Sequence, residues 1–161
     1  MILFLFLFGL TLAAVSPSDE REVKLQRGNC PMFWFSFNGR CYKYVSTRLT
    51  WADAALQCLS QGATSLVSIH SLEEQNFVNF LIKNFDHAEG PTWIGLSDRI
   101  DKKWMWSDGA PLNFTLWNGE QPKPAGEYCA YTNYGGDVKW KHQPCGYSYA
   151  YVCASRIDCP L

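Results

Sequence analysis

The seven cysteines of this 161-residue chain limit its fold more than any other feature of the sequence. No two of them have the Cys-x-x-Cys spacing that is typical of zinc sites and thioredoxin-like centres. Disulfides persist outside the cell and are rare in the cytosol, so the compartment decides what these cysteines do. Their odd number predicts that one stays outside any set of internal disulfides. They are Cys30, Cys41, Cys58, Cys129, Cys145, Cys153 and Cys159.

The N-terminus indicates export. Residues 2–15 form a nearly continuous apolar run, which is typical of a signal-peptide core. A membrane anchor is the alternative, but this run is shorter than the about 20 residues that span a bilayer. We therefore expect a signal peptide over residues 1–16, no membrane span, and a secreted, extracellular protein whose cysteines form a disulfide framework.

The remaining chain is expected to form one domain. Residues 17–29 are largely polar and predict an N-terminal arm, with a short propeptide as the alternative. Residues 30–161 are long enough to bury a core. The balance of 14 Lys+Arg against 15 Asp+Glu gives a net charge of −1, which excludes a basic nucleic-acid footprint over the whole chain. Without a Gly-x-Ser-x-Gly, His-Glu-x-x-His or phosphate-loop motif, we do not expect an enzyme.

Two of the cysteines flank a hairpin signal. Cys30 and Cys41 enclose an apolar-rich segment with Asn38-Gly39 at its turn. Asn-Gly suits a tight hairpin because both turn residues need positive φ, so the hairpin would bring the two cysteines close. Spacing does not fix the other pairings. Cys159, close to the C-terminus, is the candidate for an intermolecular disulfide, with a free or capped thiol as the alternative.

Helical patterns precede strand patterns. Residues 51–61 have apolar positions at helical spacing, with Thr50 as a cap and Gly62 as a stop. A second helix begins at Ser71 with the capping box Ser71-x-x-Glu74. Its expected core stripe comprises Phe77, Phe80, Leu81 and Phe85.

After residue 91 the pattern changes to short aromatic and β-branched runs between Gly, Pro, Asn and Asp. Such runs predict short antiparallel strands separated by long loops. The fold class is therefore α+β, with the helices first and the sheet later.

These elements contain a series of positions that matches one family in order. The series resembles the long form of the C-type lectin-like domain over residues 30–153, and this resemblance implies two helices, antiparallel sheets and a long loop region. Small secreted members of the family include the soluble lectins of fish, such as skin-mucus lactose-binding lectins, and the type II antifreeze proteins. The matching positions are the cysteine hairpin, Trp51 and Cys58 in the first helix, Trp93-Ile94-Gly95-Leu96, Trp104-x-Trp106-x-Asp108-Gly109-x-Pro111-x-x-Phe114-x-x-Trp117, and Cys129, Trp140, Cys145 and Cys153.

The resemblance also implies a disulfide connectivity. The implied pairs are Cys30–Cys41, Cys58–Cys153 and Cys129–Cys145, and they leave Cys159 unpaired.

Sugar-binding members of the family hold calcium with a Glu-Pro-Asn or Gln-Pro-Asp triplet, a glutamate before the next cysteine, and an Asn-Asp pair after a tryptophan. At these positions this chain has Gln121-Pro122-Lys123, Glu127, and Lys141-His142. Calcium requires 6–8 oxygen ligands, whereas a protonated lysine offers no lone pair and repels the ion. The auxiliary site is also altered, since Lys102 and Tyr128 accompany Asp98. We therefore expect a function that needs no calcium or other cofactor.

Loss of calcium leaves a pocket that could still bind sugar. An ammonium of Lys123 or Lys141 could take the place of the ion beside Glu127 and donate to sugar hydroxyls. Gln121 and His142 complete the expected polar set, and Tyr134 is the preferred ring for stacking on a galactose face. A decayed, solvated surface at Lys123, Lys141 and His142 is the alternative.

The favoured function is a calcium-independent lectin for galactose-type sugars such as lactose, acting in innate defence or agglutination. Its partners would be glycans on cell or microbial surfaces, and a disulfide-linked homodimer through Cys159 would add avidity. The alternative is a binder of the same fold for ice or a protein. Asn113-Phe114-Thr115 is a candidate N-glycosylation sequon.

Overall fold

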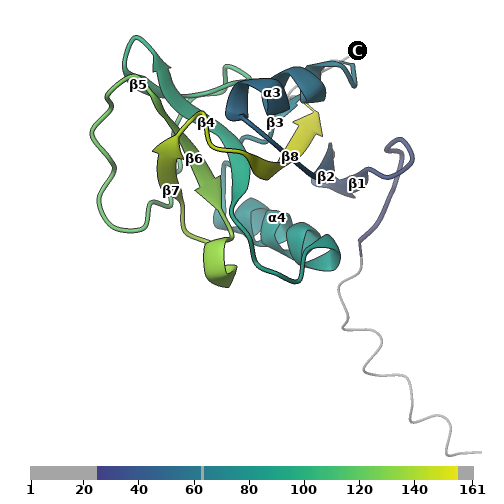
Figure 1. Ribbon diagram of the computed structural model, residues 1–161. Helices are drawn as coiled ribbons and strands as arrows, with labels where there is room; N and C mark the ends of the chain where they lie inside the picture. Colours follow the sequence, from purple (N-terminus) through teal and green to yellow (C-terminus); the bar gives the residue numbers. More distant parts are fainter. Residues whose placement is uncertain (1–24, 63, 156–161) are drawn as a thin grey trace, which may run out of the picture.

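The computed structural model of the chain, which describes residues 25–62 and 64–155, has two helices against one mixed sheet (Figure 1). The expected signal peptide, residues 17–24 of the expected arm and Cys159 lie outside the described residues. Within those residues, no helix is long and apolar enough to cross a membrane. In chain order the elements are β1 (Phe35–Phe37), β2 (Arg40–Leu49), α3 (Trp51–Leu59), β3 (Thr64–Leu66), α4 (Leu72–Phe85), β4 (Thr92–Ile100), β5 (Lys103–Trp106), β6 (Tyr128–Thr132), the 3-10 turn η1 (Tyr134–Gly136), β7 (Lys141–Pro144) and β8 (Tyr149–Ser155).

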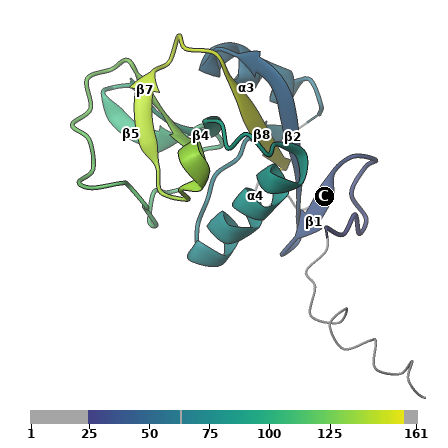
Figure 2. The ribbon, with the colours of Figure 1, turned by 60° about the horizontal axis from the view of Figure 1, so that its bottom comes forward.

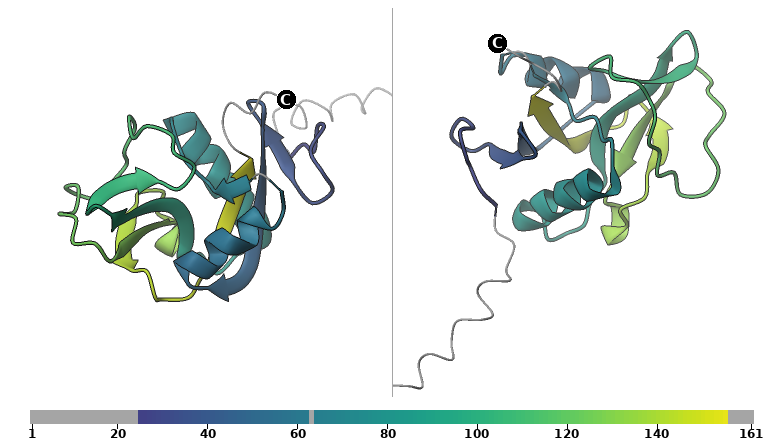
Figure 3. Two further views of the ribbon diagram at one scale, coloured as in Figure 1. Left: turned by 90° about the horizontal axis from the view of Figure 1, so that it is seen from above. Right: turned by 180° about the vertical axis from the view of Figure 1, so that it is seen from behind.

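The sheet has the strand order β1-β2-β8-β4-β6-β7, with β3 paired to β8 and β5 paired to β4. The α+β class is confirmed, but two details of the expectation are wrong. Strands β1 and β2 precede the first helix, and β4 pairs with β8 in parallel. The parallel pair arises because the last strand returns to the centre of the sheet, where it separates β2 from β4. Helices α3 and α4 lie on opposite sides of these central strands (Figures 2 and 3).

The three implied disulfides are confirmed. Cys30–Cys41 closes the β1–β2 hairpin, whose turn residues Asn38 and Gly39 have φ values of 47° and 82°. The second bridge ties α3 to β8, and the third ties β6 to the segment after β7. They are Cys58–Cys153 and Cys129–Cys145.

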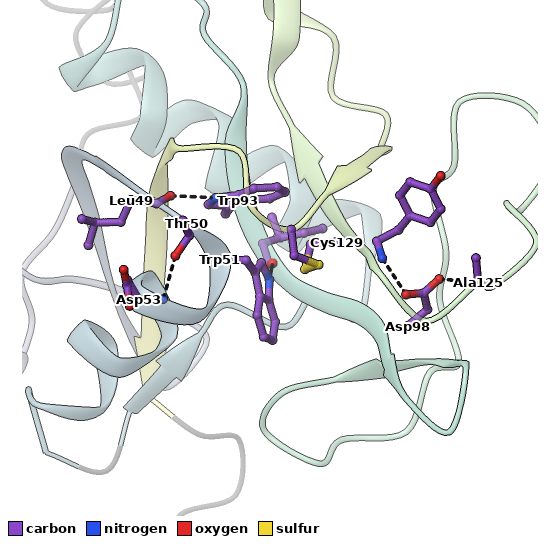
Figure 4. Close-up of a disulfide and its surroundings, with 11 residues drawn as sticks. Leu49, Thr50, Trp51, Asp53, Trp93, Asp98, Ala125 and Cys129 are labelled. Atoms are coloured by element: carbon purple, nitrogen blue, oxygen red, sulfur yellow. Dashed lines mark hydrogen bonds between the residues drawn. A yellow bond between two sulfur atoms is a disulfide. The ribbon is translucent and has the colours of Figure 1, made fainter.

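Both helices begin where the sequence predicts. The Thr50 hydroxyl accepts a hydrogen bond from the backbone N–H of Asp53 at 3.3 Å (Figure 4), and Ser71 Oγ accepts one from the Glu74 N–H at 3.0 Å. These bonds satisfy N–H groups that have no partner inside the helix. Gly62, with φ of 86°, lies just beyond the end of α3.

The expected core stripe of α4 is confirmed only in part: Leu81 is fully buried and Phe77 packs against the core, whereas Phe85 is 53% exposed. The buried face is partly polar, and its polar groups have partners inside the protein. The Glu74 carboxylate pairs with Arg40, and Gln75 Oε1 accepts the Trp140 indole N–H at 2.6 Å. The buried residues of the helix are Glu74, Gln75, Val78, Asn79, Leu81 and Ile82.

Candidate ligand-binding site

The long loop, residues 107–127, joins β5 to β6 and projects from one end of the molecule (Figures 1 and 2). Trp117 connects it to the sheet through a β-bridge with Trp140. The backbone N–H of Trp140 donates to Leu116 O at 2.7 Å, and the Asn118 N–H donates to Trp140 O at 2.8 Å. The middle of the loop is therefore fixed beside the start of β7.

Asp98 and Trp104 hold the end of the long loop that contains the Gln121-Pro122-Lys123 triplet. The Asp98 side chain is fully buried, and its two oxygens accept the backbone N–H groups of Ala125 at 2.8 Å and Tyr128 at 2.7 Å (Figure 4). The Trp104 indole N–H donates to the carbonyl oxygen of Pro122 at 2.9 Å. Groups of the protein itself therefore close the loop.

The triplet presents its polar side chains to solvent. Gln121 and Lys123 are exposed, and the described part of the chain offers neither side chain a hydrogen bond or ion pair. The peptide bond before Pro122 is trans. Asn113, the sequon residue, is also exposed on the long loop.

The side chains of Lys141 and His142 point to opposite faces of the sheet, because successive side chains of strand β7 alternate between the two faces. The Lys141 ammonium lies 5.1 Å from the centre of the Tyr134 ring. The His142 ring packs edge-on against Tyr128, with centroids 5.0 Å apart, and lies 6.5 Å from Trp104. His142 therefore lies on the same side as Trp104, which holds the triplet, whereas Lys141 contacts Tyr134.

Tyr134 is an exposed ring near Tyr131. It is 56% exposed and follows Asn133, which has φ of 76°. Burial, and then the neighbouring phenols of Tyr149 and Tyr134, raise the pKa of Tyr131. One face of the Tyr134 ring already carries a cation–π contact to Lys141, which leaves the other face for a ligand.

Glu127 lies apart from both lysines. Its carboxylate is exposed and lines a shallow depression with Arg99 and Pro144. Within residues 25–62 and 64–155 it forms no ion pair, so the expected contact with Lys123 or Lys141 is not made in this structure. Its two oxygens therefore remain available as acceptors.

These side chains do not fit a calcium site. Calcium needs several converging oxygens, whereas the Asp98 carboxylate is directed at the backbone N–H groups of Ala125 and Tyr128. Among the described residues, no three His, Cys, Asp or Glu side chains lie close enough to share a metal ion. Lys123 and Lys141 bring positive charge to two of the positions where the resemblance expects oxygen ligands.

Sequence reasoning missed the role of Trp104 and assigned Asp98 to a degraded metal site. Trp104 stood out only as one of a run of tryptophans. Its hydrogen bond joins residues 18 positions apart, so no local pattern could have indicated it. The Asp98 carboxylate acts as an anchor because folding brings the end of the loop back to the middle of β4.

Comparisons with known proteins show the family of the chain. A sequence model of the Lectin C-type domain matches residues 47–155. The chain is 35% identical to the galactose-specific lectin nattectin of Thalassophryne nattereri, over 92% of this chain and 94% of the relative. It is 40% identical to a type-2 ice-structuring protein of Osmerus mordax, over 78% of this chain and 70% of the relative.

Solved structures with the same fold include two antifreeze proteins and human lithostathine. A Ca²⁺-dependent type II antifreeze protein in its Ca²⁺-free form is 37% identical, with a TM-score of 0.70 over 78% of this chain and 99% of that one. A calcium-independent type II antifreeze protein is 31% identical, with a TM-score of 0.70 over 84% and 98%. Human lithostathine is 31% identical, with a TM-score of 0.72 over 79% and 99%.

Proposed function

Because the chain belongs to the Lectin C-type domain family, we propose that it is a secreted, calcium-independent lectin for galactose-type sugars such as lactose. The family model describes a lectin domain and nattectin is named a lectin, so the protein is a binding protein and not an enzyme. The observation that carries the proposal is the closure of the long loop by Asp98 and Trp104. These hydrogen bonds hold the long loop in one conformation, which is a role that a bound metal ion could otherwise fill.

The polar groups for sugar recognition are those that the fold leaves unengaged. Gln121 supplies both an acceptor and donors, Lys123 supplies donors, and Glu127 supplies acceptors. Hydrogen bonds from a charged group to a hydroxyl are stronger than neutral ones. His142, held against Tyr128, is the fourth polar member of this set.

Lys141 and Tyr134 form a second part of the proposed surface. The exposed face of Tyr134 can stack against the apolar face of a galactose ring, and Lys141 fixes the ring from the other side. The name of nattectin, a galactose-specific relative aligned over nearly the whole chain, supports galactose as the sugar.

The test is retention of the secreted protein on lactose-agarose, with and without a calcium chelator, followed by elution with free lactose. We expect retention in both conditions. Lys123→Ala should reduce retention, whereas Lys83→Ala, an exposed lysine on α4, should leave it unchanged. Retention that disappears with the chelator would overturn the calcium-independent mechanism, and absence of retention in both conditions would overturn lactose as the ligand.

Ice binding is the second candidate, because the ice-structuring relative of Osmerus mordax is 40% identical. Measurement of thermal hysteresis separates the two functions, since a sugar-binding surface need not stop ice growth. The charges of Lys123 and Lys141 favour the lectin, because ice binding favours a flat, regular and weakly charged face.

A disulfide-linked homodimer through Cys159 would place two sugar sites on one molecule and raise avidity for glycan-coated surfaces. Such a molecule could agglutinate cells or microbes. Electrophoresis with and without reductant, compared with a Cys159→Ser variant, measures the dimer directly.

A further inference from the structure

A second pocket lies at an irregularity of β2, away from the long loop. Strand β2 pairs with β8 through Val45↔Tyr151 and next through Leu49↔Tyr149. Between these pairs β2 advances four residues and β8 only two, so β2 bulges outward. Bulges bend a strand and redirect its side chains, and they are frequent beside binding sites.

The bulge, the end of α4 and the start of β8 enclose a cavity of about 240 Å³. Pockets for drug-sized ligands have volumes of about 300–1,000 Å³, so this one suits a single small ring. No residue of the long loop lines it, and it is therefore distinct from the site proposed above.

Aromatic rings form part of the wall. The rings of Tyr44 and Phe85 are stacked, with centroids 6.2 Å apart and planes inclined by 10°, and Phe85 is 53% exposed. Tyr149 lines the cavity as well and is fixed by its contact with Trp93, at 4.7 Å between centroids. Rigid aromatic faces of this kind bind the C–H face of a ring.

An acidic and a basic side chain also line this cavity. Asp86 ends α4, and its two oxygens accept the backbone N–H groups of Ala88 at 2.8 Å and Gly90 at 3.2 Å. These bonds, together with a hydrogen bond from the Tyr44 hydroxyl, fix the carboxylate, and about one of its four lone-pair sites remains for a ligand. Arg48 is exposed and, within the described residues, forms no ion pair, so its guanidinium donors remain available.

Tyr44, Arg48 and Asp86 line the same cavity. Burial, followed by the negative charge of Asp86, raises the pKa of Tyr44 to about 12, and the positive charge of Arg48 opposes this rise. Tyr44 is therefore a neutral phenol at physiological pH. One cation and one anion balance each other in the lining, which favours a neutral ligand over an anionic one.

We propose that this cavity is a second binding site for one neutral monosaccharide unit. The ring stacks on Phe85 or Tyr149, Arg48 donates to its hydroxyls, and Asp86 accepts from them. Ser46 and Ser148 add hydroxyl groups to the lining. Two separated sites on one chain would crosslink glycans without a dimer, and this second site does not depend on the sugar bound by the long loop.

The experiment is titration of the isotopically labelled protein with galactose, mannose and N-acetylglucosamine, each followed by amide chemical shifts. At least one sugar should shift the amides of Gly90, Ser148 and Ala150. Arg48→Gln and Asp86→Asn should each weaken this response about tenfold, since each removes a charge-assisted hydrogen bond. Lys83→Gln, an exposed residue of α4 outside the cavity, should not change it.

The proposal is overturned when none of the three sugars shifts these amides, or when both variants bind as the unaltered protein does. Shifts confined to the amides around Lys123 also overturn it and leave the long-loop site intact. Shifts confined to the cavity support it while contradicting the long-loop site.

Discussion

Trp104 on β5 donates its indole N–H to the carbonyl oxygen of Pro122, 18 residues further along the chain, at 2.9 Å. Trp104 is 6% exposed, and its partly buried hydrogen bond fixes the Gln121-Pro122-Lys123 triplet of the long loop to the sheet. The same ring stands 4.8 Å from Trp117 and 6.5 Å from His142. One side chain thus connects the triplet, the middle of the loop and β7.

Trp104→Phe is expected to loosen the long loop. Phenylalanine keeps most of the packing but leaves the Pro122 carbonyl without its donor, at a cost of about 0.5–1.5 kcal/mol. Hydrogen exchange of the Ala125 amide should become up to about tenfold faster. Trp106→Phe is the matched control, because the described residues offer the buried Trp106 indole N–H no acceptor. Equal exchange in both variants would contradict the anchoring role.

Calcium is not expected to change the thermal stability of the protein. A calcium ion that bound the folded state at about 100 to 1,000 times its Kd would stabilise it by about 3–4 kcal/mol and raise Tm by several degrees. Melting in excess calcium and in chelator should therefore give the same Tm. The positive control is the triple variant Lys123→Asp, Lys141→Asn, His142→Asp, which restores oxygen ligands and should gain a calcium-dependent rise. A rise in the unaltered protein would contradict the proposal.

The parts of the fold that sequence could predict are local or depend on a matched family pattern. The Asn38-Gly39 turn and the Thr50 cap follow from neighbouring residues. The disulfides between distant cysteines followed from the resemblance alone. Neither source indicated that β8 would return between β2 and β4, because strand order is decided by contacts across the whole chain.

The residues of the candidate site could be named from the sequence, but their positions relative to one another could not. Lys141 and His142 are adjacent in sequence, yet strand geometry sends them to opposite faces, one to Tyr134 and the other to Tyr128. The polar face of α4 was unpredictable for a related reason. A glutamine in this sequence pattern suggests a solvent-facing residue. In the fold, Trp140, far along the chain, donates a hydrogen bond to Gln75.

Glu74→Gln should be strongly destabilising. The Glu74 carboxylate accepts hydrogen bonds from Arg40 at 2.6 Å and from the Tyr42 hydroxyl at 2.5 Å, and all three side chains are buried. Removing one charge leaves the Arg40 guanidinium in the core with a weaker partner, and the loss of one member of a buried ion pair costs about 3–5 kcal/mol. Urea unfolding measures the change.

The control for that variant is Glu73→Gln, one position earlier on the exposed side of α4. Exposed substitutions of this kind change stability by about 0.5 kcal/mol or less. Similar losses for Glu73→Gln and Glu74→Gln would show that the buried pair is not the source of the effect.

The same polar cluster should make stability depend on pH through His70. Its Nε2 lies 2.9 Å from Ser68 Oγ, and Ser68 donates its only proton to Asp108 Oδ2, so the neutral imidazole donates from Nε2. Burial is the main cause that lowers the pKa of His70 below its usual 6.5. The charges of Glu74 and Asp108 oppose this shift, and the charge of Arg40 adds to it.

Because the pKa of His70 is lower in the folded state, the unfolded chain binds more protons at mildly acidic pH. The contribution of His70 to stability is therefore complete above about pH 6.5, falls as the pH drops below that value, and levels off below the folded-state pKa. Urea unfolding of the unaltered protein and of His70→Gln between about pH 7.5 and about pH 5 isolates this contribution. The unaltered protein should lose more stability than the variant over that range, whereas parallel losses would assign the pH dependence to other groups.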